Sequence, residues 1–323
     1  ALAADVDTLD PHWGYDAASL FVVDQVYETL IDFKGESLES FEPRIATVVP
    51  SLENGFLSRD GLTYAFPLRI GAKFHDGSIL SAVDVKYSLM RFLLIDREGG
   101  PSNLLLYALI GVRSTNELPP DQIFDLADKA ISMEGGSVVL RMQKPFAPLL
   151  GILANFAHIV SKGYVEAGGG WDGKKASWVA QRNPAKEKAA LYARMNGTGP
   201  FKLELWDRAG KRISLVRNEN YWRKLASLSR VNLTAVLDSR ERRRRLAAGE
   251  VDVAFVERRY LDQFEGLPGV IVADGLPSLE TQNTVLFNLH TEPKDNPWLG
   301  SGTLGDGVPP DFFPDLDVRK AFA

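Results

Sequence analysis

The side chains best suited to catalysis in this sequence are four histidines, His12, His75, His158 and His290. No two of them stand in the HxH or HExxH spacing of a zinc hydrolase, and the sequence contains no GxSxG nucleophile motif. His75 is followed directly by Asp76, but neighbouring side chains in an extended segment point to opposite faces. The pattern therefore predicts no catalytic residue and no metal ligand.

Carboxylates are the second source of catalysis that we considered. A glycoside hydrolase needs two carboxyl groups that face each other across the scissile bond. The sequence contains 42 Asp and Glu residues, so a pair chosen from among them indicates nothing by itself. A hydrolase therefore stays only as a general alternative. Turnover of labelled peptides that vanished when His75 or Asp76 was replaced would favour it.

The segment Asn196–Phe201, with the sequence NGTGPF, contains two glycines that suit either a phosphate-binding loop or a close crossing of two chain segments. In a phosphate-binding loop the glycines precede a helix and a lysine. Here alternating residues after Pro200 predict a strand, and Lys202 stands at the wrong position. We interpret Gly197 and Gly199 as crossing residues, and we predict no cofactor.

The charge of the chain argues against a nucleic-acid partner, because the formal net charge of its 323 residues is -5. The five arginines between Arg240 and Arg245 stand near Glu241 and Glu250, a pattern typical of a solvated helix face with ion pairs. There is no cysteine, which excludes disulfides and thiolate metal sites. The most apolar run, residues 149–160, is shorter than the roughly 20 residues that a membrane helix needs.

The elements that must position these residues are clearest in the first hundred residues. Asp-Gly at 60–61 predicts a tight turn, and alternation over 63–68 predicts a half-buried strand. A second Asp-Gly turn at 76–77 leads to a helix that begins after Ser81, with Asp84 at capping-box spacing.

The opening of the chain, residues 7–12 (DTLDPH), leads into a predicted helix over 19–30 whose apolar residues share one face. Ser19 is its predicted N-cap. The loop between them contains Trp13 and Tyr15, which suit packing at a loop base as well as they suit contact with a ligand.

The later part of the chain has a strand–helix–strand pattern over 231–236, 238–249 and 250–255. Such a pattern predicts a crossover between parallel strands. A further strand is predicted over 282–290, and an apolar helix face begins within 315–323.

Several of these motifs occur together and in order. They are TLDP followed by VYETL, the turn–strand–turn–helix of residues 60–89, GTGPF…W…G…IxLxRNxxYW over residues 197–222, and DLDVRKAFA at 315–323. The set closely resembles the extracellular solute-binding proteins of peptide- and nickel-type bacterial ABC importers, a family of receptors without catalytic machinery. The resemblance covers essentially the whole chain, but only about three-fifths of a full-length member of the family.

The resemblance implies an α/β fold of the periplasmic-binding-protein type, in the peptide-binding cluster, with two lobes and a ligand between them. We expect lobe I to be discontinuous, formed by residues 1–32 and 191–277, with 33–190 inserted as an α+β subdomain. We expect 278–323 to contain the hinge strand and the start of lobe II. Most of lobe II is then missing, and we expect the chain to be truncated at both ends, without its export signal or lipid anchor.

The resemblance also implies which residues line the ligand cleft. The opening loop, the glycine crossing, the hinge and the inserted subdomain contribute the candidates Trp13, Tyr15, Asp16, Ser19, Tyr107, Asn155, Thr198, Gly199, Gln282, Asn283 and Asn288. The implied function is capture of a peptide or similar solute and its delivery to a membrane permease. A nickel chelate or an oligosaccharide in the same fold is the alternative.

The resemblance further implies the partners and the place of action. We expect a monomer that binds a small molecule or peptide and docks on an ABC permease, at the periplasmic or extracellular face of the membrane. We expect no nucleic-acid partner.

Overall fold

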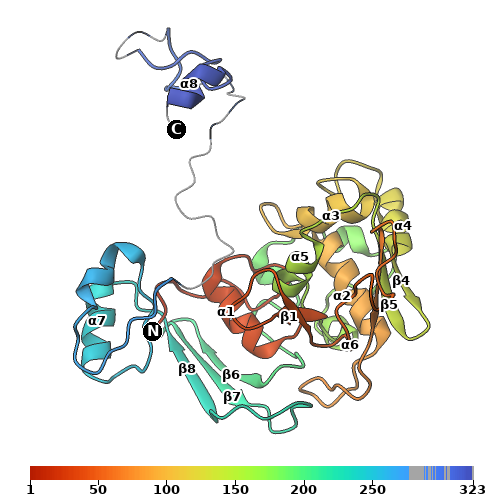
Figure 1. The fold of residues 1–323 in the computed structure, drawn as a ribbon, viewed down its shortest axis with the longest axis horizontal. Helices are drawn as coiled ribbons and strands as arrows, with labels where there is room; N and C mark the ends of the chain where they lie inside the picture. The colour runs from red at the N-terminus through yellow and green to blue at the C-terminus, as the bar shows by residue number, and fades with distance from the viewer. Residues whose placement is uncertain are drawn as a thin grey trace. The chain divides into compact units, whose positions relative to one another are not determined.

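Helices and short strands alternate along the chain (Figure 1). The computed structural model describes residues 1–275, 287, 289, 292, 294, 296–301, 303 and 306–321, and it divides into two units, Ala1–Pro277 and Ser278–Ala323. The strand predicted over 282–290 lies outside the described residues, apart from Phe287 and Leu289. In chain order the elements are α1 (Ala17–Val26), β1 (Ile31–Phe33), β2 (Phe41–Pro43), β3 (Thr63–Pro67), α2 (Ala82–Ile95), α3 (Ser102–Ile110), α4 (Pro120–Ala130), β4 (Ile131–Glu134), β5 (Ser137–Arg141), α5 (Leu149–Phe156), α6 (Lys162–Ala167), the 3₁₀ turns η1 (Trp178–Gln181) and η2 (Lys186–Lys188), β6 (Phe201–Asp207), β7 (Arg212–Arg217), β8 (Arg230–Thr234), α7 (Ser239–Ala247), η3 (Arg258–Gln263) and α8 (Leu316–Ala321).

The two predicted helix starts near the beginning of the chain have different outcomes. The capping box before α2 is confirmed, because the Ser81 N–H donates to the Asp84 carboxylate at 3.0 Å and the Ser81 side chain accepts from the Asp84 N–H. The predicted cap of α1 is wrong. Asp16 caps this helix by accepting the Ser19 N–H at 2.9 Å, because a carboxylate three residues earlier satisfies that donor.

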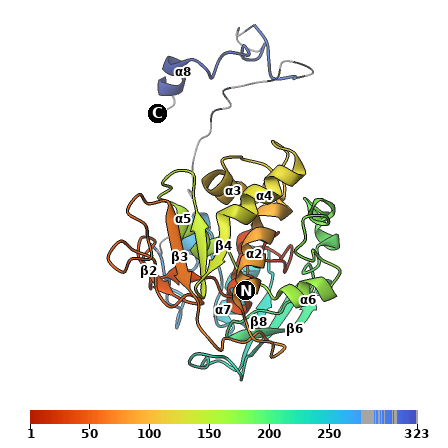
Figure 2. The same ribbon diagram turned by 90° about the vertical axis from the view of Figure 1, so that its right-hand side faces the viewer.

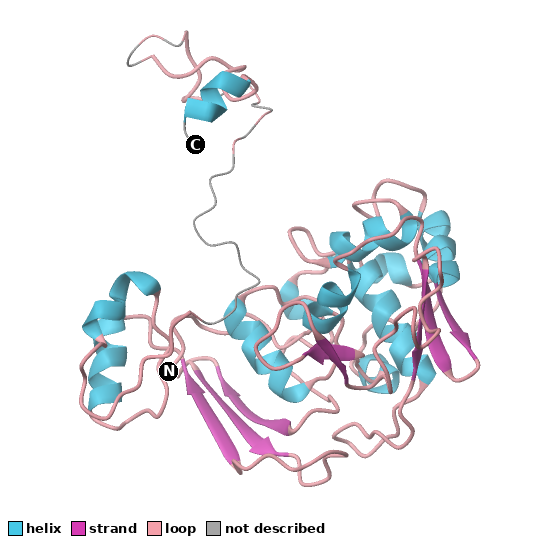
Figure 3. Ribbon diagram, viewed as in Figure 1, coloured by secondary structure: helices cyan, strands magenta, loops and turns pink. Residues whose placement is uncertain are grey.

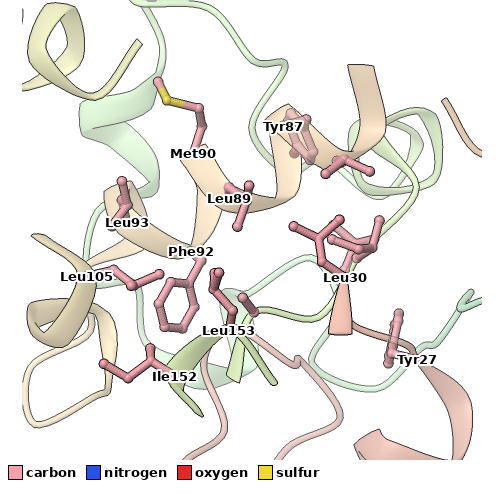
Figure 4. Packing of buried hydrophobic residues seen from close by; sticks show 14 of the residues in the cluster. Tyr27, Leu30, Tyr87, Leu89, Met90, Phe92, Leu93, Leu105, Ile152 and Leu153 are labelled. Carbon is pink, nitrogen blue, oxygen red and sulfur yellow. The ribbon is translucent and has the colours of Figure 1, made fainter. Parts of the chain in front are cut away.

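The sheet β3-β5-β4 is antiparallel throughout and is the centre of residues 33–190. Helices α2 and α4 pack against it (Figure 2), and α2 also contacts α3. A continuous set of buried apolar side chains fills the space between these elements (Figure 4). Phe92 and Leu93 of α2, Leu105 of α3 and Leu153 of α5 are each fully buried in it. The same core extends to Tyr27 and Leu30 at the end of α1, which is how the first and middle parts of unit 1 are joined.

The second three-stranded sheet, β6-β7-β8, is also antiparallel, and α1 contacts β6 (Figure 3). The strand predicted after Pro200 is therefore confirmed as β6. Its register with β7 shifts between Leu203 and Leu205, a bulge that bends the strand.

The predicted strand at 250–255 is not formed as a regular strand. The described backbone instead places Ala1 and Leu2 between two extended segments. Leu2 pairs in parallel with Ala235, while the Ala1 carbonyl accepts the Phe255 N–H at 2.9 Å. The N-terminal amine also donates to the Val253 carbonyl. Residues 1–2, distant in sequence, thus lie between strand 231–236 and the segment at 250–255, an insertion that periodicity does not reveal.

The second unit contains α8 and one isolated parallel bridge, Leu299 to Val308, among its described residues. Within the part of the chain that the structure describes, no helix has both the length and the apolar character needed to cross a bilayer.

Candidate functional site

The chain crosses itself where residues 196–200 pass the end of α1. A Cβ atom added to Gly197 or Gly199 would stand 1.9 or 2.7 Å from the carbonyl oxygen of Val26, so only glycine fits at either position. The Gly199 N–H donates to that oxygen at 2.9 Å, and the Gly197 carbonyl accepts the His75 N–H at 2.9 Å. These contacts confirm the crossing. They also engage glycine backbone groups that a phosphate-binding loop would direct at its ligand.

A buried carboxylate, that of Glu28, lies at this crossing. Its Oε2 accepts hydrogen bonds from Thr198 Oγ1 and Trp222 Nε1, and its Oε1 accepts one from the Tyr221 hydroxyl, all at 2.8 Å. Burial, the largest cause, raises the pKa of Glu28, and the three donors oppose it. Both oxygens are occupied by the protein's own groups, so Glu28 fixes the crossing and has little capacity left for a ligand.

The Glu28 site joins three sequence motifs. Glu28 belongs to VYETL, Thr198 to NGTGPF, and Tyr221 and Trp222 to RNxxYW. Sequence reasoning treated these motifs as marks of the fold and did not select Glu28, Tyr221 or Trp222. Glu28 follows the end of α1 at Val26, and no local pattern in the sequence marks it as buried.

A hollow of about 360 Å³ opens beside the crossing. It contains one of the predicted site residues, Asn155 of α5, and it borders Pro200, the neighbour of Gly199. The other charged or amide side chains of its wall, none of which was selected from the sequence, are Asp24, Gln25, Glu28, Asp32 and Arg44. We call this feature the polar hollow.

The opening loop contacts α5 through Tyr15, which does not itself line the polar hollow. This side chain is 47% exposed, and its ring lies 5.5 Å from that of Phe156, the residue after Asn155. Trp13 points elsewhere. Its Nε1 donates to the Pro184 carbonyl at 3.1 Å, and the Arg97 guanidinium lies 4.0 Å from the centre of its ring.

The other predicted residues of this group serve the protein's own structure. Ser19 is fully buried, and its hydroxyl accepts the N–H groups of Asp7 and Thr8 at 3.0 and 3.2 Å. Asp16 caps α1, and Thr198 is fully buried against Glu28.

Three of the remaining candidates have no described placement. Gln282, Asn283 and Asn288 lie outside the described residues. Tyr107 on α3 is 45% exposed and carries the Arg113 guanidinium 5.9 Å from its ring centre, but it is not part of the wall of the polar hollow.

A buried ion pair between Arg91 and Asp10 anchors the opening loop to α2. Arg91 donates to both oxygens of Asp10, at 2.8 and 2.5 Å, and also to His12 Nδ1 at 3.0 Å. His12 Nε2 therefore carries the proton that it donates to the His158 carbonyl at 2.8 Å. Burial and the nearby Arg91 lower the pKa of His12 to about 3, so this imidazole is neutral at physiological pH.

Two of the other histidines, His75 and His158, contact groups of the protein itself, and His290 lies outside the described residues. His75 Nε2 lies 3.0 Å from the Gly199 carbonyl, whereas the Asp76 carboxylate accepts from Ser78 and Asn196, so the two side chains are not hydrogen-bonded to each other. Across the described residues, no group of three or more His, Cys, Asp or Glu side chains is placed to hold a metal ion.

Comparison with known proteins places this geometry in a family. The profile described as "Bacterial extracellular solute-binding proteins, family 5 Middle" matches residues 41–323. The chain is 30% identical over 260 residues to the "Probable D,D-dipeptide-binding periplasmic protein DdpA" of Escherichia coli (strain K12), covering 78% of this chain and 42% of that protein. It is 25% identical over 290 residues to the oligopeptide-binding protein OppA of Bacillus subtilis (strain 168), covering 88% of this chain and 45% of that protein.

A solved structure agrees with these relatives. The ABC transporter-associated periplasmic binding protein DppA from Helicobacter pylori, in complex with peptide STSA, matches with a TM-score of 0.58 and 27% identity, over 83% of this chain and 48% of that one. The chain thus spans less than half the length of the two curated relatives named above. The likeness confirms the expected α/β solute-binding fold. Since the family profile covers most of the sequence, the chain belongs to the bacterial extracellular solute-binding proteins of family 5.

Proposed function

We propose that this protein is the solute-binding receptor of an ABC importer and that its cargo is a peptide. The observation that carries the proposal is the family match over residues 41–323. The relatives named above add the chemical class of the cargo, because their names specify a D,D-dipeptide, an oligopeptide and the bound peptide STSA.

The proposed site lies where the opening loop, α5 and the crossing approach one another. Asn155 brings an amide to the wall of the polar hollow, and Tyr15 brings an exposed ring to the next residue of α5, Phe156. We propose that Trp13, Asp16, Ser19, Thr198 and Gly199 hold these elements in place, and that Tyr107, Gln282, Asn283 and Asn288 complete the cleft.

The proposed mechanism is closure of two lobes about a hinge. Lobe I would consist of residues 1–32 and 191–277 with 33–190 inserted, and residues 278–323 would supply the hinge strand and the beginning of lobe II. A ligand drives closure only to the extent that it binds the closed form more tightly than the open form. Contacts from both lobes supply that difference, and no bond of the cargo is made or broken.

The proposed partner is a membrane permease powered by separate ATP-hydrolysing subunits. We place the receptor at the periplasmic or extracellular face of the membrane. We propose that it acts as a monomer, so that each closed chain delivers one bound solute to the permease.

A thermal-shift screen of the full-length protein tests the cargo. Ligand binding adds RT ln(1 + [L]/Kd) to the free energy of unfolding, about 2.7 kcal/mol at a ligand concentration of 100 Kd. We expect di- to tetrapeptides to raise the melting temperature, with nickel–histidine and maltooligosaccharides as controls that do not. Mass spectrometry of the bound peptide should recover it intact. A shift with either control but with no peptide, or recovery of cleaved peptide, would contradict the proposal.

A further inference from the structure

The polar hollow contains one carboxylate that the protein leaves half exposed. The side chain of Asp24 is 50% accessible, and its Oδ1 lies 2.8 Å from His158 Nε2. No other hydrogen bond to this carboxylate occurs among the described residues, so one oxygen is available to a ligand. Gln25 and Asn155 bring two amide groups to the same wall, and neither side chain has a hydrogen bond within the described part of the chain.

The arginine in the wall of the polar hollow, Arg44, does not pair with Asp24. Arg44 is engaged by two carboxylates, those of Asp32 at 2.8 Å and Glu42 at 3.3 Å. His158 is almost fully buried, and its Nδ1 has no hydrogen-bond partner among the described residues. His158 therefore offers Asp24 one hydrogen bond, from Nε2.

The position of Asp24 on its helix adds to this imbalance. Asp24 lies in the last turn of α1, which contains no basic residue. The unpaired carbonyl groups at the end of a helix carry partial negative charge, and an acidic side chain there is unfavourable. Asp24 is thus unfavourable for the stability of α1. The wall of the hollow also carries more acidic than basic side chains. Both features favour the binding of a cation in the hollow.

We propose that the polar hollow binds an ammonium or guanidinium group of the solute, with Asp24 as the counter-charge and the Gln25 and Asn155 amide oxygens as further acceptors. This inference deepens the proposed function and rests on it: the receptor selects cargo that carries a positive group. The hollow is large enough for a side chain or a peptide amino terminus. The Glu28 carboxylate takes no direct part, because its oxygens are already occupied.

The test uses isothermal titration of the full-length protein with tripeptides that carry lysine or norleucine at each position in turn, and with their N-acetylated forms. Norleucine keeps the aliphatic stem and removes the ammonium group. We expect that either lysine-to-norleucine replacement at one position or N-acetylation removes the bound ammonium group. Affinity should then fall about tenfold, the effect of losing one charge-assisted hydrogen bond. Asp24→Asn keeps an acceptor for His158 Nε2 and should abolish that difference.

Two further variants separate this result from misfolding. Asn155→Asp adds a negative charge to the same wall and should increase the preference for the cationic peptide, a gain that a damaged fold does not produce. Asp262→Asn removes an exposed carboxylate of η3 that does not line the hollow, and it should leave the preference unchanged. Equal affinity for charged and uncharged peptides, or a preference that persists in Asp24→Asn, overturns this inference and leaves the proposed function intact. Failure of every peptide to bind overturns both.

Discussion

The crossing and the polar hollow are neighbours in unit 1, yet they use polar groups in opposite ways. At the crossing, the Glu28 carboxylate accepts three hydrogen bonds, and the Gly199 N–H and carbonyl are both engaged. At the hollow, Asp24 has one hydrogen-bond partner in the described part of the chain, His158, and stays half exposed. The strong sequence motifs therefore determine how the chain folds at the crossing. The residues that remain available to a ligand lie next to these motifs and belong to no recognisable motif.

This difference has an energetic reason. A buried polar group without a partner costs about 1 to 3 kcal/mol, so the crossing is stable only when all of its groups are paired. An exposed carboxylate is solvated by water and can stay unpaired until a ligand arrives. Substitutions at the crossing should therefore cost stability, and substitutions at the hollow should cost binding.

The largest effect is expected for Gly197→Ala. Its Cβ would lie 1.9 Å from the Val26 carbonyl oxygen, a backbone atom that cannot turn aside as the end of a flexible side chain can. We expect a loss of more than about 5 kcal/mol in the free energy of unfolding, or no folded protein, measured by urea denaturation. Gly151→Ala is the matched control. This glycine lies in α5 with open space around it, so alanine should be neutral or stabilise the helix by up to about 1 kcal/mol. Equal stability of the two variants would refute the close crossing.

The next effect is expected for Glu28→Ala. The change removes the acceptor of Thr198, Tyr221 and Trp222 and leaves their donors unpaired. We expect a loss of about 4 kcal/mol by urea denaturation. Glu219→Ala serves as control, since it removes only a surface ion pair with Arg217 and should cost less than about 1 kcal/mol. A small loss for Glu28→Ala would show that the carboxylate does not organise the crossing.

A third effect is a pH dependence that comes from the crossing. Burial, the largest cause, lowers the pKa of His75 from 6.5 to about 4. Between these values the unfolded chain binds more protons than the folded chain, so the free energy of unfolding falls as pH decreases from about 6.5 to about 4. The contribution is complete above pH 6.5 and amounts to at most roughly 3 kcal/mol.

His75→Gln isolates this contribution, because glutamine still offers an N–H to the Gly199 carbonyl and does not titrate. Urea denaturation at pH 7 and pH 4.5 should give a smaller loss of stability for the variant than for the unchanged protein. The buried His12, whose pKa is lowered to about 3, should continue the decline in both proteins. An identical loss in the two would rule out His75 as a source of the pH dependence.

The order of the elements could be predicted from the sequence because local chemistry determines it. The Ser81–Asp84 capping box and the alternation of β3 and β6 depend on residues that are only a few positions apart in the sequence. The edge formed by Ala1 and Leu2 beside Ala235 could not be predicted, because its partners are more than 200 residues apart in sequence.

The candidate site was predictable only in part, for the same physical reason. The resemblance predicts Asn155, which lines the polar hollow, and Tyr15, whose ring contacts the next residue of α5, Phe156. Asp24 and Arg44 were missed, because a charged residue on a helix face or a strand end is ordinary in a sequence. Their importance comes only from the groups that surround them in space.

The smallest expected effect distinguishes the two regions most directly. Asp24→Asn should raise the free energy of unfolding slightly, by about 0.3 to 1 kcal/mol, because it removes a negative charge from the last turn of α1 while keeping an acceptor for His158. The same variant is expected to lose its preference for a cationic solute. A residue whose removal stabilises the fold and weakens binding is maintained for function, a trade that proteins commonly show at their binding sites. Measurement of urea denaturation without ligand decides the matter: a loss of 2 kcal/mol or more would place Asp24 with the crossing, as part of the structure that positions the site.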